Sequence, residues 1–178
     1  SLIAVCGELP ADQIKRIPGG DEYKQNIIKQ LKKRKQIKTF YKDGLRGYRL
    51  LLPTKELLLR QNPNRFNFYL TGVNETNHIR SEITRRLRLH RLAETTVSML
   101  NSGAEIYRDN KQDIFSPIYT PTEITSPSFY NSREIKELGI DTIKINGARA
   151  MGVLLTEYNV FSVYNLGDSM MKWDYKAE

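Results

Sequence analysis

The fold of the first third of the chain is decided by Pro18 to Leu50, which reads PGGDEYKQNIIKQLKKRKQIKTFYKDGLRGYRL. Proline followed by two glycines cannot continue a helix, so the short helix expected over residues 10–17 ends in a tight turn. Asp21 then caps a second helix, and the 3.6-residue spacing of apolar side chains carries that helix to about Lys35. The sequence therefore predicts two helices joined by a tight turn.

After this helix the pattern changes to a period of two, which is typical of a half-buried strand. One side of the strand holds Ile37, Thr39 and Tyr41, and the other side holds Lys38, Phe40 and Lys42. Asp43 and Gly44 supply the backbone angles of a tight reversal, so residues 37–50 should form a β-hairpin. A short helix over residues 55–60, capped by Thr54, is expected to follow.

The basic charge of the chain is concentrated in this first part. The whole sequence has 28 Lys and Arg against 20 Asp and Glu, a formal net charge of +8. Residues 1–65 carry 15 basic and 6 acidic side chains, whereas residues 104–178 carry 8 and 11. From Lys24 to Arg49, ten basic side chains stand against one acid, Asp43. Such a concentration repels itself, and a polyanion would relieve the repulsion by releasing counterions. Nucleic acid is therefore the expected partner, and a solvated lysine surface is the alternative.

The second helix has one apolar arc and one arc of amides and amines. The apolar arc, which should face a core, consists of Tyr23, Ile27, Ile28 and Leu31. Lys24 lies beside this arc and would have to extend past it to reach water. The opposite arc holds the candidate DNA-binding side chains Gln25, Asn26, Lys29, Lys32 and Lys33. Amides can bind adenine edges and lysines can bind guanine or phosphate oxygens, which is the chemistry of a groove-facing helix.

The order of helix, glycine-rich turn, basic helix and Asp-Gly hairpin resembles the winged-helix variant of the helix-turn-helix family over residues 2 to about 62. The resemblance implies that the helix after the turn enters the major groove and that the hairpin, or wing, touches the DNA backbone or minor groove. On this sequence the wing contacts would be Lys42, Arg46 and Arg49, in addition to the helix residues named above. A winged helix that binds RNA or protein is the alternative.

A long amphipathic helix is expected over residues 74–101. Its apolar face would consist of Ile79, Ile83, Leu87, Leu89, Ala93, Val97 and Leu100. A polar set recurs every four residues on or beside this face, namely Glu82, Arg86, His90 and Glu94. Histidine and glutamate at this spacing can share a divalent ion. The whole chain has two histidines, which excludes a three-histidine centre. The preferred interpretation is an ion pair between Glu82 and Arg86, with His90 in the core or at the boundary between two domains. No metal or cofactor is expected.

The last part of the chain should form a small α/β module. The stretch 109–131 is rich in Pro, Ser and Thr and predicts an extended loop, after which Ser132 caps a short helix. Strands are expected over residues 104–107, 142–145, 150–156 and 160–165, the last two as an antiparallel hairpin. A metal-dependent nuclease of restriction-endonuclease-like type is the alternative function, with Asp141, Glu157, Asp174 and Lys176 as candidate residues. They do not follow the required strand positions, so no catalytic residue is predicted.

The whole layout also resembles the replication-relaxation type of protein found on Gram-positive plasmids and integrative elements. The segments that carry this resemblance are LRGYRL at 45–50, TGVNETNH at 71–78 and RAMGV at 149–153. It implies a role in plasmid replication or mobilisation, and it brings no catalytic signature.

Together these patterns predict an α+β protein. It would have an N-terminal winged-helix DNA-binding domain over residues 1–65, a long connecting helix over 66–103 and a small mixed or antiparallel sheet with helices over 104–178. Double-stranded DNA is the expected partner, in mobile-element replication, mobilisation or transcriptional control. The acidic last part would serve dimerisation or be a degenerate nuclease-like module. A single cysteine, Cys6, and the lack of a long apolar run predict a cytoplasmic protein without a membrane span. The chain does not begin with Met, so its natural start is expected further upstream.

Overall fold

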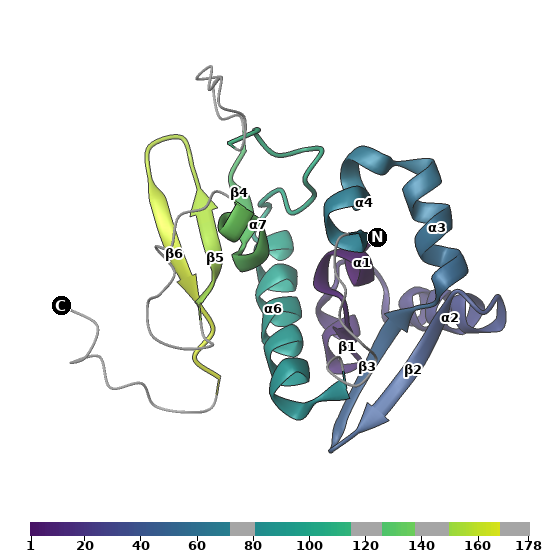
Figure 1. Ribbon diagram of the computed structural model, residues 1–178. Helices are drawn as coiled ribbons and strands as arrows, with labels where there is room; N and C mark the ends of the chain where they lie inside the picture. Colours follow the sequence, from purple (N-terminus) through teal and green to yellow (C-terminus); the bar gives the residue numbers. More distant parts are fainter. Residues whose placement is uncertain (72–80, 115–125, 138–149, 168–178) are drawn as a thin grey trace.

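The computed structural model describes residues 1–71, 81–114, 126–137 and 150–167. Within these ranges the chain has an α+β fold with two small antiparallel sheets, each of three strands. Figure 1 shows the two sheets on either side of the long helix α6, which spans Ile83–Asn101. The expected α+β class is confirmed. No helix in the described ranges is both long enough and apolar enough to cross a bilayer.

The first sheet consists of a short strand and a hairpin. In chain order the elements are α1 (Leu2–Cys6), β1 (Leu9–Pro10), the 3₁₀ helix η1 (Asp12–Arg16), α2 (Asp21–Lys33), β2 (Ile37–Lys42) and β3 (Leu45–Leu50). β3 lies between β1 and β2, and both of its neighbours run antiparallel to it. The hairpin expected over residues 37–50 is confirmed, and its turn residues Asp43 and Gly44 have positive φ angles of 53° and 76°. The helix expected over residues 10–17 is present only as the short 3₁₀ helix η1.

The core under this sheet joins α1, β1, η1, α2, the hairpin and α6. Its buried members are Ile3, Cys6, Leu9, Ile14, Ile28, Ile37, Tyr48, Ala93 and Val97. Helix α1 was not expected from the sequence, because five residues are too few to show a helical period. Burial against α4 and α6 stabilises it instead, since an isolated helix of this length is unstable in water.

Two helices follow the hairpin, α3 (Leu52–Gln61) and α4 (Pro63–Leu70). α3 begins earlier than expected because Pro53 fits the first turn of a helix, so Thr54 lies inside the helix and not at its cap. α4 was not expected, since the sequence indicated only an end of the preceding helix before Pro63. In the structure Pro63 is the first residue of α4, and the Asn62 side chain caps it by accepting a hydrogen bond from Arg65 N at 2.9 Å.

The long helix is shorter than the expected helix over residues 74–101. α6 begins at Ile83 because Glu82 has an extended backbone, with φ −63° and ψ 138°. Residues 74–80 of the expected helix lie outside the described residues. The predicted apolar face is buried at Ala93 and Val97 but exposed at Ile83 and Leu87. At the start of the helix the buried position is instead Arg86, whose side chain contacts carbonyl oxygens of the hairpin.

α6 also belongs to the second core. That core consists of Leu92, Ala104, Ile106, Phe129 and Met151. Ala93 and Val97, on the neighbouring part of the helix surface, belong to the first core. α6 therefore contributes buried side chains to both cores, and it does more than connect two modules.

The second sheet has the strand order β4 (Ser128–Asn131), β5 (Ala150–Leu155) and β6 (Val160–Tyr164), all antiparallel. Helix α7 (Ser132–Glu137) follows β4 directly. The expected hairpin of β5 and β6 and the short helix after Ser132 are confirmed. β4 corrects the prediction of a loop up to Asn131, because all four of its residues are buried and paired with β5. The strand expected over 142–145 lies outside the described residues.

Candidate nucleic-acid interface

α2 exposes four of its five predicted DNA-binding side chains: Gln25, Asn26, Lys29 and Lys33. The fifth, Lys32, is half-buried, and its ammonium lies 5.0 Å from the centroid of the Tyr48 ring. This cation–π contact holds Lys32 against the sheet. Within the described part of the chain, the Lys29 and Lys33 side chains make no hydrogen bond or ion pair, so both ammonium groups face water.

The apolar arc of α2 faces the core only in part. Ile28 is buried, and Leu31 packs against the first core. Tyr23, by contrast, is 68% exposed, and Ile27 is exposed as well. The prediction that all four residues face a core is wrong for these two, because the core under α2 covers only a narrow stripe of the helix. The outer side of α2 therefore carries an aromatic ring as well as amides and amines.

Lys24 occupies one of the covered positions of α2. Its Nζ donates to the carbonyl oxygens of Lys15 and Ile17, both at 2.9 Å, and lies 2.7 Å from Asp21 Oδ1. The ammonium thus satisfies carbonyl groups at the end of η1 that have no partner within the helix. Lys24 fixes η1 to the first turn of α2, and it does not extend past the apolar arc into water.

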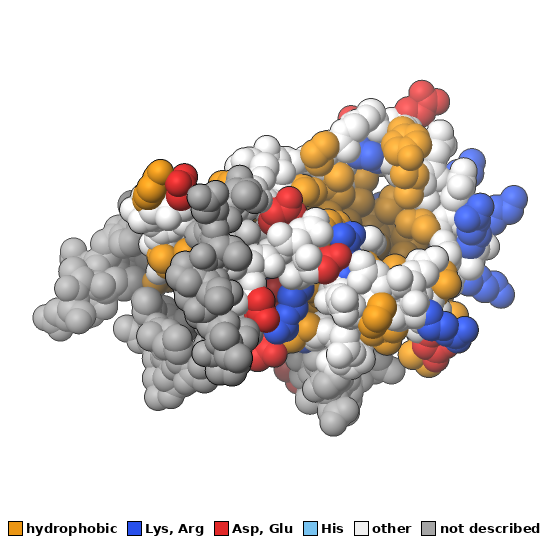
Figure 2. All heavy atoms as spheres, turned by 90° about the horizontal axis from the view of Figure 1, so that it is seen from above, with side chains coloured by type: hydrophobic (Ala, Val, Ile, Leu, Met, Phe, Trp, Pro, Cys, Tyr) orange, Lys and Arg blue, Asp and Glu red, His pale blue; other side chains and the backbone are white. Residues whose placement is uncertain are grey.

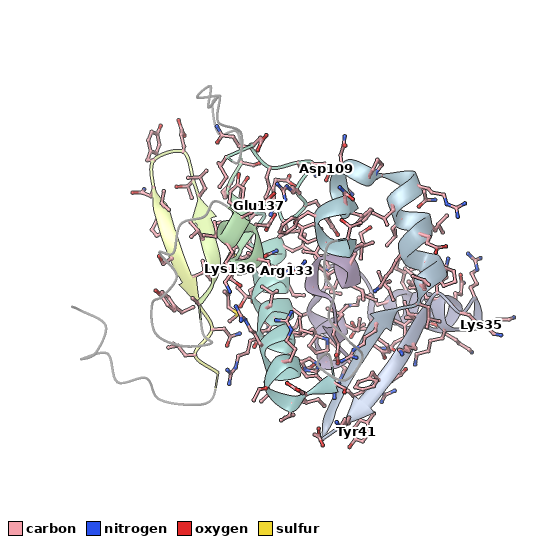
Figure 3. All side chains as sticks on the ribbon, in the orientation of Figure 1. Lys35, Tyr41, Asp109, Arg133, Lys136 and Glu137 are labelled. Atoms are coloured by element: carbon pink, nitrogen blue, oxygen red, sulfur yellow. The ribbon has the colours of Figure 1, made fainter. Side chains whose placement is uncertain are left out.

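Most of the basic residues between Lys24 and Arg49 reach solvent. Seven of the ten are exposed: Lys29, Lys33, Arg34, Lys35, Lys38, Lys42 and Arg46. Figure 2 shows lysine and arginine side chains gathered at the edge of the molecule where α2 lies, and Lys35 projects from that edge in Figure 3. We define the α2 surface as Gln25, Asn26, Lys29, Lys33, Arg34 and Lys35.

The hairpin does not present its predicted contacts on one side. Successive residues of a strand point to opposite sides of the sheet, and the register pairs Tyr41 with Arg46. Both lie on the side that carries Tyr48, which Lys32 of α2 covers. Lys42 is exposed on the other side. Of the exposed hairpin cations predicted as contacts, Arg46 therefore shares a side of the sheet with α2 and Lys42 does not.

Tyr41 is an exposed aromatic residue that the sequence-based site prediction missed. It is 71% exposed, and Figure 3 shows it near the tip of the hairpin, next in register to Arg46. The alternation of the strand could have indicated it. Tyr41 lies on the same side of β2 as the buried Ile37, but the core does not extend as far as Tyr41. An aromatic ring beside a guanidinium is suited to contact with bases and phosphates.

Arg49 points into the protein, which conflicts with its predicted role as a wing contact. Its side chain is only 14% exposed, and its Nη2 lies 2.6 Å from Glu8 Oε2. Its Nε donates to the same oxygen at 2.7 Å, and the guanidinium lies 4.0 Å from the centroid of the Phe40 ring. Arg49 is therefore committed to an internal carboxylate.

Glu8 is the centre of a buried group of charges, which we call the Glu8 cluster and define as Glu8, Arg49, Arg86 and His90. Arg86 is completely buried, and its Nη2 donates to Glu8 Oε1 at 2.5 Å. His90 Nε2 lies 2.9 Å from the same oxygen. Arg86 also donates to the hairpin carbonyl oxygens of Lys42 at 2.7 Å and Leu45 at 3.0 Å. The cluster thus fastens the hairpin to α6.

Among the described residues, the polar side chains Arg86, His90 and Glu94 of α6 make structural contacts. Arg86 and His90 both contact Glu8, and Glu94 Oε1 lies 3.2 Å from Arg16 Nη1. Among the described residues no group of three His, Cys, Asp or Glu side chains could hold a metal ion. Of the residues considered for a nuclease, Glu157 is exposed in the turn between β5 and β6. The other three, Asp141, Asp174 and Lys176, lie outside the described residues.

The Glu8 cluster should make stability depend on acid pH. Burial alone would raise the pKa of Glu8, but the hydrogen bonds from His90, Arg86 and Arg49 outweigh burial and lower the pKa from 4.5 to about 2. The folded state therefore binds fewer protons than the unfolded state between these values. The stabilisation, about 3 kcal/mol, is complete above pH 4.5 and is lost as the pH falls towards 2.

Urea unfolding at a series of pH values between 5 and 2 measures this loss, which we expect to be much smaller in the Glu8→Gln variant. Glu22→Gln, which removes an exposed carboxylate of α2, is the control and should retain the parent's pH dependence. An unchanged pH dependence in Glu8→Gln would assign the acid sensitivity to other carboxylates.

No protein-family model matches the chain, and neither a curated protein nor a solved structure matches it. The function is therefore inferred from the exposed chemistry of α2 and the hairpin.

Proposed function

We propose that the chain binds duplex DNA through the α2 surface and through the side of the hairpin that carries Tyr41 and Arg46. The observation that supports this most is the exposure of five basic side chains on α2, directly after it and on the same side of the hairpin, beside two exposed amides of α2. These cations are Lys29, Lys33, Arg34, Lys35 and Arg46. Lysine and arginine bind phosphates and release counterions, and amides bind base edges. These are the two kinds of contact that a specific DNA-binding helix needs.

The arrangement of the elements supports the same proposal. α2 has 13 residues and is about 20 Å long at about 1.5 Å per residue, and a helix of this width fits the major groove. It follows a tight turn and is followed at once by the hairpin, which is the order that the winged-helix resemblance implies. In this binding mode α2 lies in the major groove, and the hairpin tip lies on the adjacent backbone or minor groove.

Replacing Lys29 and Lys33 together by alanine should weaken binding to duplex DNA at least about tenfold at low salt, near about 50 mM. Two lost phosphate contacts should also make the slope of log K against log salt shallower by about 2. Fluorescence anisotropy of a labelled duplex over a range of salt concentrations measures both quantities. Lys32 is left unchanged, because its contact with Tyr48 is part of the fold.

The matched control is Lys15→Ala with Arg60→Ala, which removes two exposed positive charges outside the α2 surface. It should change the affinity and the slope much less than the α2 variant does. Equal losses in the two variants, or parental affinity in the α2 variant, would show that α2 is not the DNA-binding surface. Competition with single-stranded RNA separates duplex binding from RNA binding.

The biological setting of this binding comes from the second resemblance. If the chain acts as the replication-relaxation type of protein does, the bound duplex belongs to a plasmid or an integrative element. Selection of bound sequences from a random duplex pool would identify the site, and a palindromic result would indicate that a dimer binds.

A further inference from the structure

An open pocket of about 810 Å³ lies between α4 and α7. α4 lines it with Asn64, Asn67 and Phe68, which lie on one face of the helix, and α7 contributes Arg133 and Lys136. Figure 3 shows Arg133, Lys136 and Glu137 together on α7, in the middle of the molecule, whereas Lys35 lies at its edge. No residue of α2 or the hairpin is part of the pocket's described lining, so the pocket is separate from the α2 surface. Its volume is in the range of small-molecule sites.

Two arginines of the pocket are held in place by one aromatic ring. The Arg108 guanidinium lies 4.5 Å from the centroid of Phe68, and its Nη1 donates to Glu137 Oε2 at 2.7 Å. The Arg133 guanidinium lies 5.4 Å from the same centroid, and its Nη2 donates to Phe68 O at 3.5 Å. Contacts of this kind orient a guanidinium before a ligand binds, so less side-chain entropy is lost on binding. A guanidinium has five N–H groups, so one group can serve the protein and a ligand together.

The described lining of the pocket has an excess of positive charge. It contains three cations, Arg108, Arg133 and Lys136, and one carboxylate, Glu137. Lys136 is exposed and lies one helical turn after Arg133. Guanidinium groups bind the oxygens of a phosphate in pairs, and lysine adds a point charge. A ligand with two or more negative charges therefore complements the pocket, and a neutral or cationic ligand does not.

We propose that this pocket is a second binding site, which takes the phosphate groups of a nucleotide or of a nucleic-acid strand. Arg108 and Arg133 hold the phosphate oxygens, and Lys136 adds charge at the rim. The amides of Asn64 and Asn67 are placed to contact the sugar or the base. Glu137 competes with the phosphate for the Arg108 guanidinium and so limits the affinity. This site does not require that α2 binds DNA.

The test is titration of the full chain with three probes by isothermal titration calorimetry at low salt. The probes are pyrophosphate, ATP and a short single-stranded oligodeoxynucleotide. Lys136→Gln should weaken binding roughly three- to tenfold, because one charged contact is lost. Glu137→Gln should strengthen binding by a similar factor, because the competing carboxylate is removed. Thermal melting of each variant checks that it is folded, and both substitutions are at exposed positions.

The matched controls are Lys15→Gln and Glu22→Gln, which make the same changes of charge at exposed positions outside both the pocket and the α2 surface. They should leave binding of ATP and pyrophosphate unchanged. Opposite responses of ATP binding to the two pocket substitutions would support a free nucleotide as the ligand. The same responses for the oligonucleotide alone would support a nucleic-acid strand. The site would be ruled out if no probe binds, or if the pocket substitutions act no more strongly than the controls.

Discussion

Replacing Arg86 by methionine should lower the free energy of unfolding by about 3–5 kcal/mol, because a buried carboxylate loses a buried partner. Arg86 and Glu8 are both completely buried, and the guanidinium is in direct contact with the carboxylate. Methionine keeps much of the packing volume, so most of the loss is electrostatic. Urea unfolding followed by far-UV circular dichroism measures it, and the thermal midpoint should fall by about 10 °C.

The same substitution removes hydrogen bonds that Arg86 donates to the backbone of the hairpin. Arg86 Nη1 donates to Lys42 O, and Nη2 donates to Leu45 O, on either side of the Asp43–Gly44 turn. Hydrogen exchange of the hairpin amides should therefore become faster than that of α2. A uniform acceleration over the whole chain would instead indicate global destabilisation alone.

The control for this prediction is Arg60→Met, which makes the same change at an exposed position of α3 and should cost less than about 0.5 kcal/mol. Glu8→Gln should cost less in the Arg86→Met background than in the parent, because the two residues share one interaction. A loss below about 1 kcal/mol for Arg86→Met would mean that Arg49 and His90 are sufficient partners for Glu8.

Replacing Lys111 by methionine should destabilise the region around the second core, which contains Phe129, by a similar amount, about 3–5 kcal/mol. Lys111 Nζ donates to Glu134 Oε1 at 2.7 Å and to Phe129 O at 2.6 Å, and both charged side chains are almost completely buried. Burial lowers the pKa of Lys111, and the charge of Glu134 opposes that shift. Without the ammonium, the Glu134 carboxylate keeps the hydroxyl of Tyr69 and the N–H of Asn131, but among the described residues it has no buried cation at hydrogen-bond distance.

Urea unfolding again measures the loss, with Lys136→Met as the matched control, since this lysine is exposed on the same helix as Glu134. Glu134→Gln should recover part of the stability of the Lys111→Met variant. The neutral amide removes the buried charge, and its single oxygen still accepts one of the two hydrogen bonds that Tyr69 and Asn131 donate to separate oxygens of Glu134. If Lys111→Met and Lys136→Met unfold at the same urea concentration, the buried pair contributes nothing to holding α4, β4 and α7 together.

The elements that the sequence predicted well are those with local signals. Pro18 with its two glycines marked the turn before α2, and Asp43-Gly44 marked the hairpin turn, because turn chemistry depends on neighbouring residues only. The elements that it missed, α1, β1, α4 and β4, are short or lack a clear period. The helices are stabilised by burial against distant elements and the strands by pairing with distant strands, and a local pattern contains neither.

The positions of the candidate site residues were also predictable from the sequence only where they depend on neighbouring residues. The exposure of Gln25, Asn26, Lys29 and Lys33 follows from the helical period alone. The inward position of Arg49 does not, because its partner Glu8 is 41 residues away in the chain. The pocket between α4 and α7 brings together side chains from positions 63 to 137, and no single stretch of sequence indicates it.

The sequence by itself determined the order of helices and strands around the two marked turns and the stretch of chain in which the positive charge is concentrated. Both depend on backbone preferences and composition over a few residues. Only the tertiary structure decided which of the cations face water. Lys24, Arg86 and Lys111 are buried and Arg49 is mostly covered, because carboxylates and carbonyl groups from other elements meet them there. A charge leaves water only where such partners are already in place.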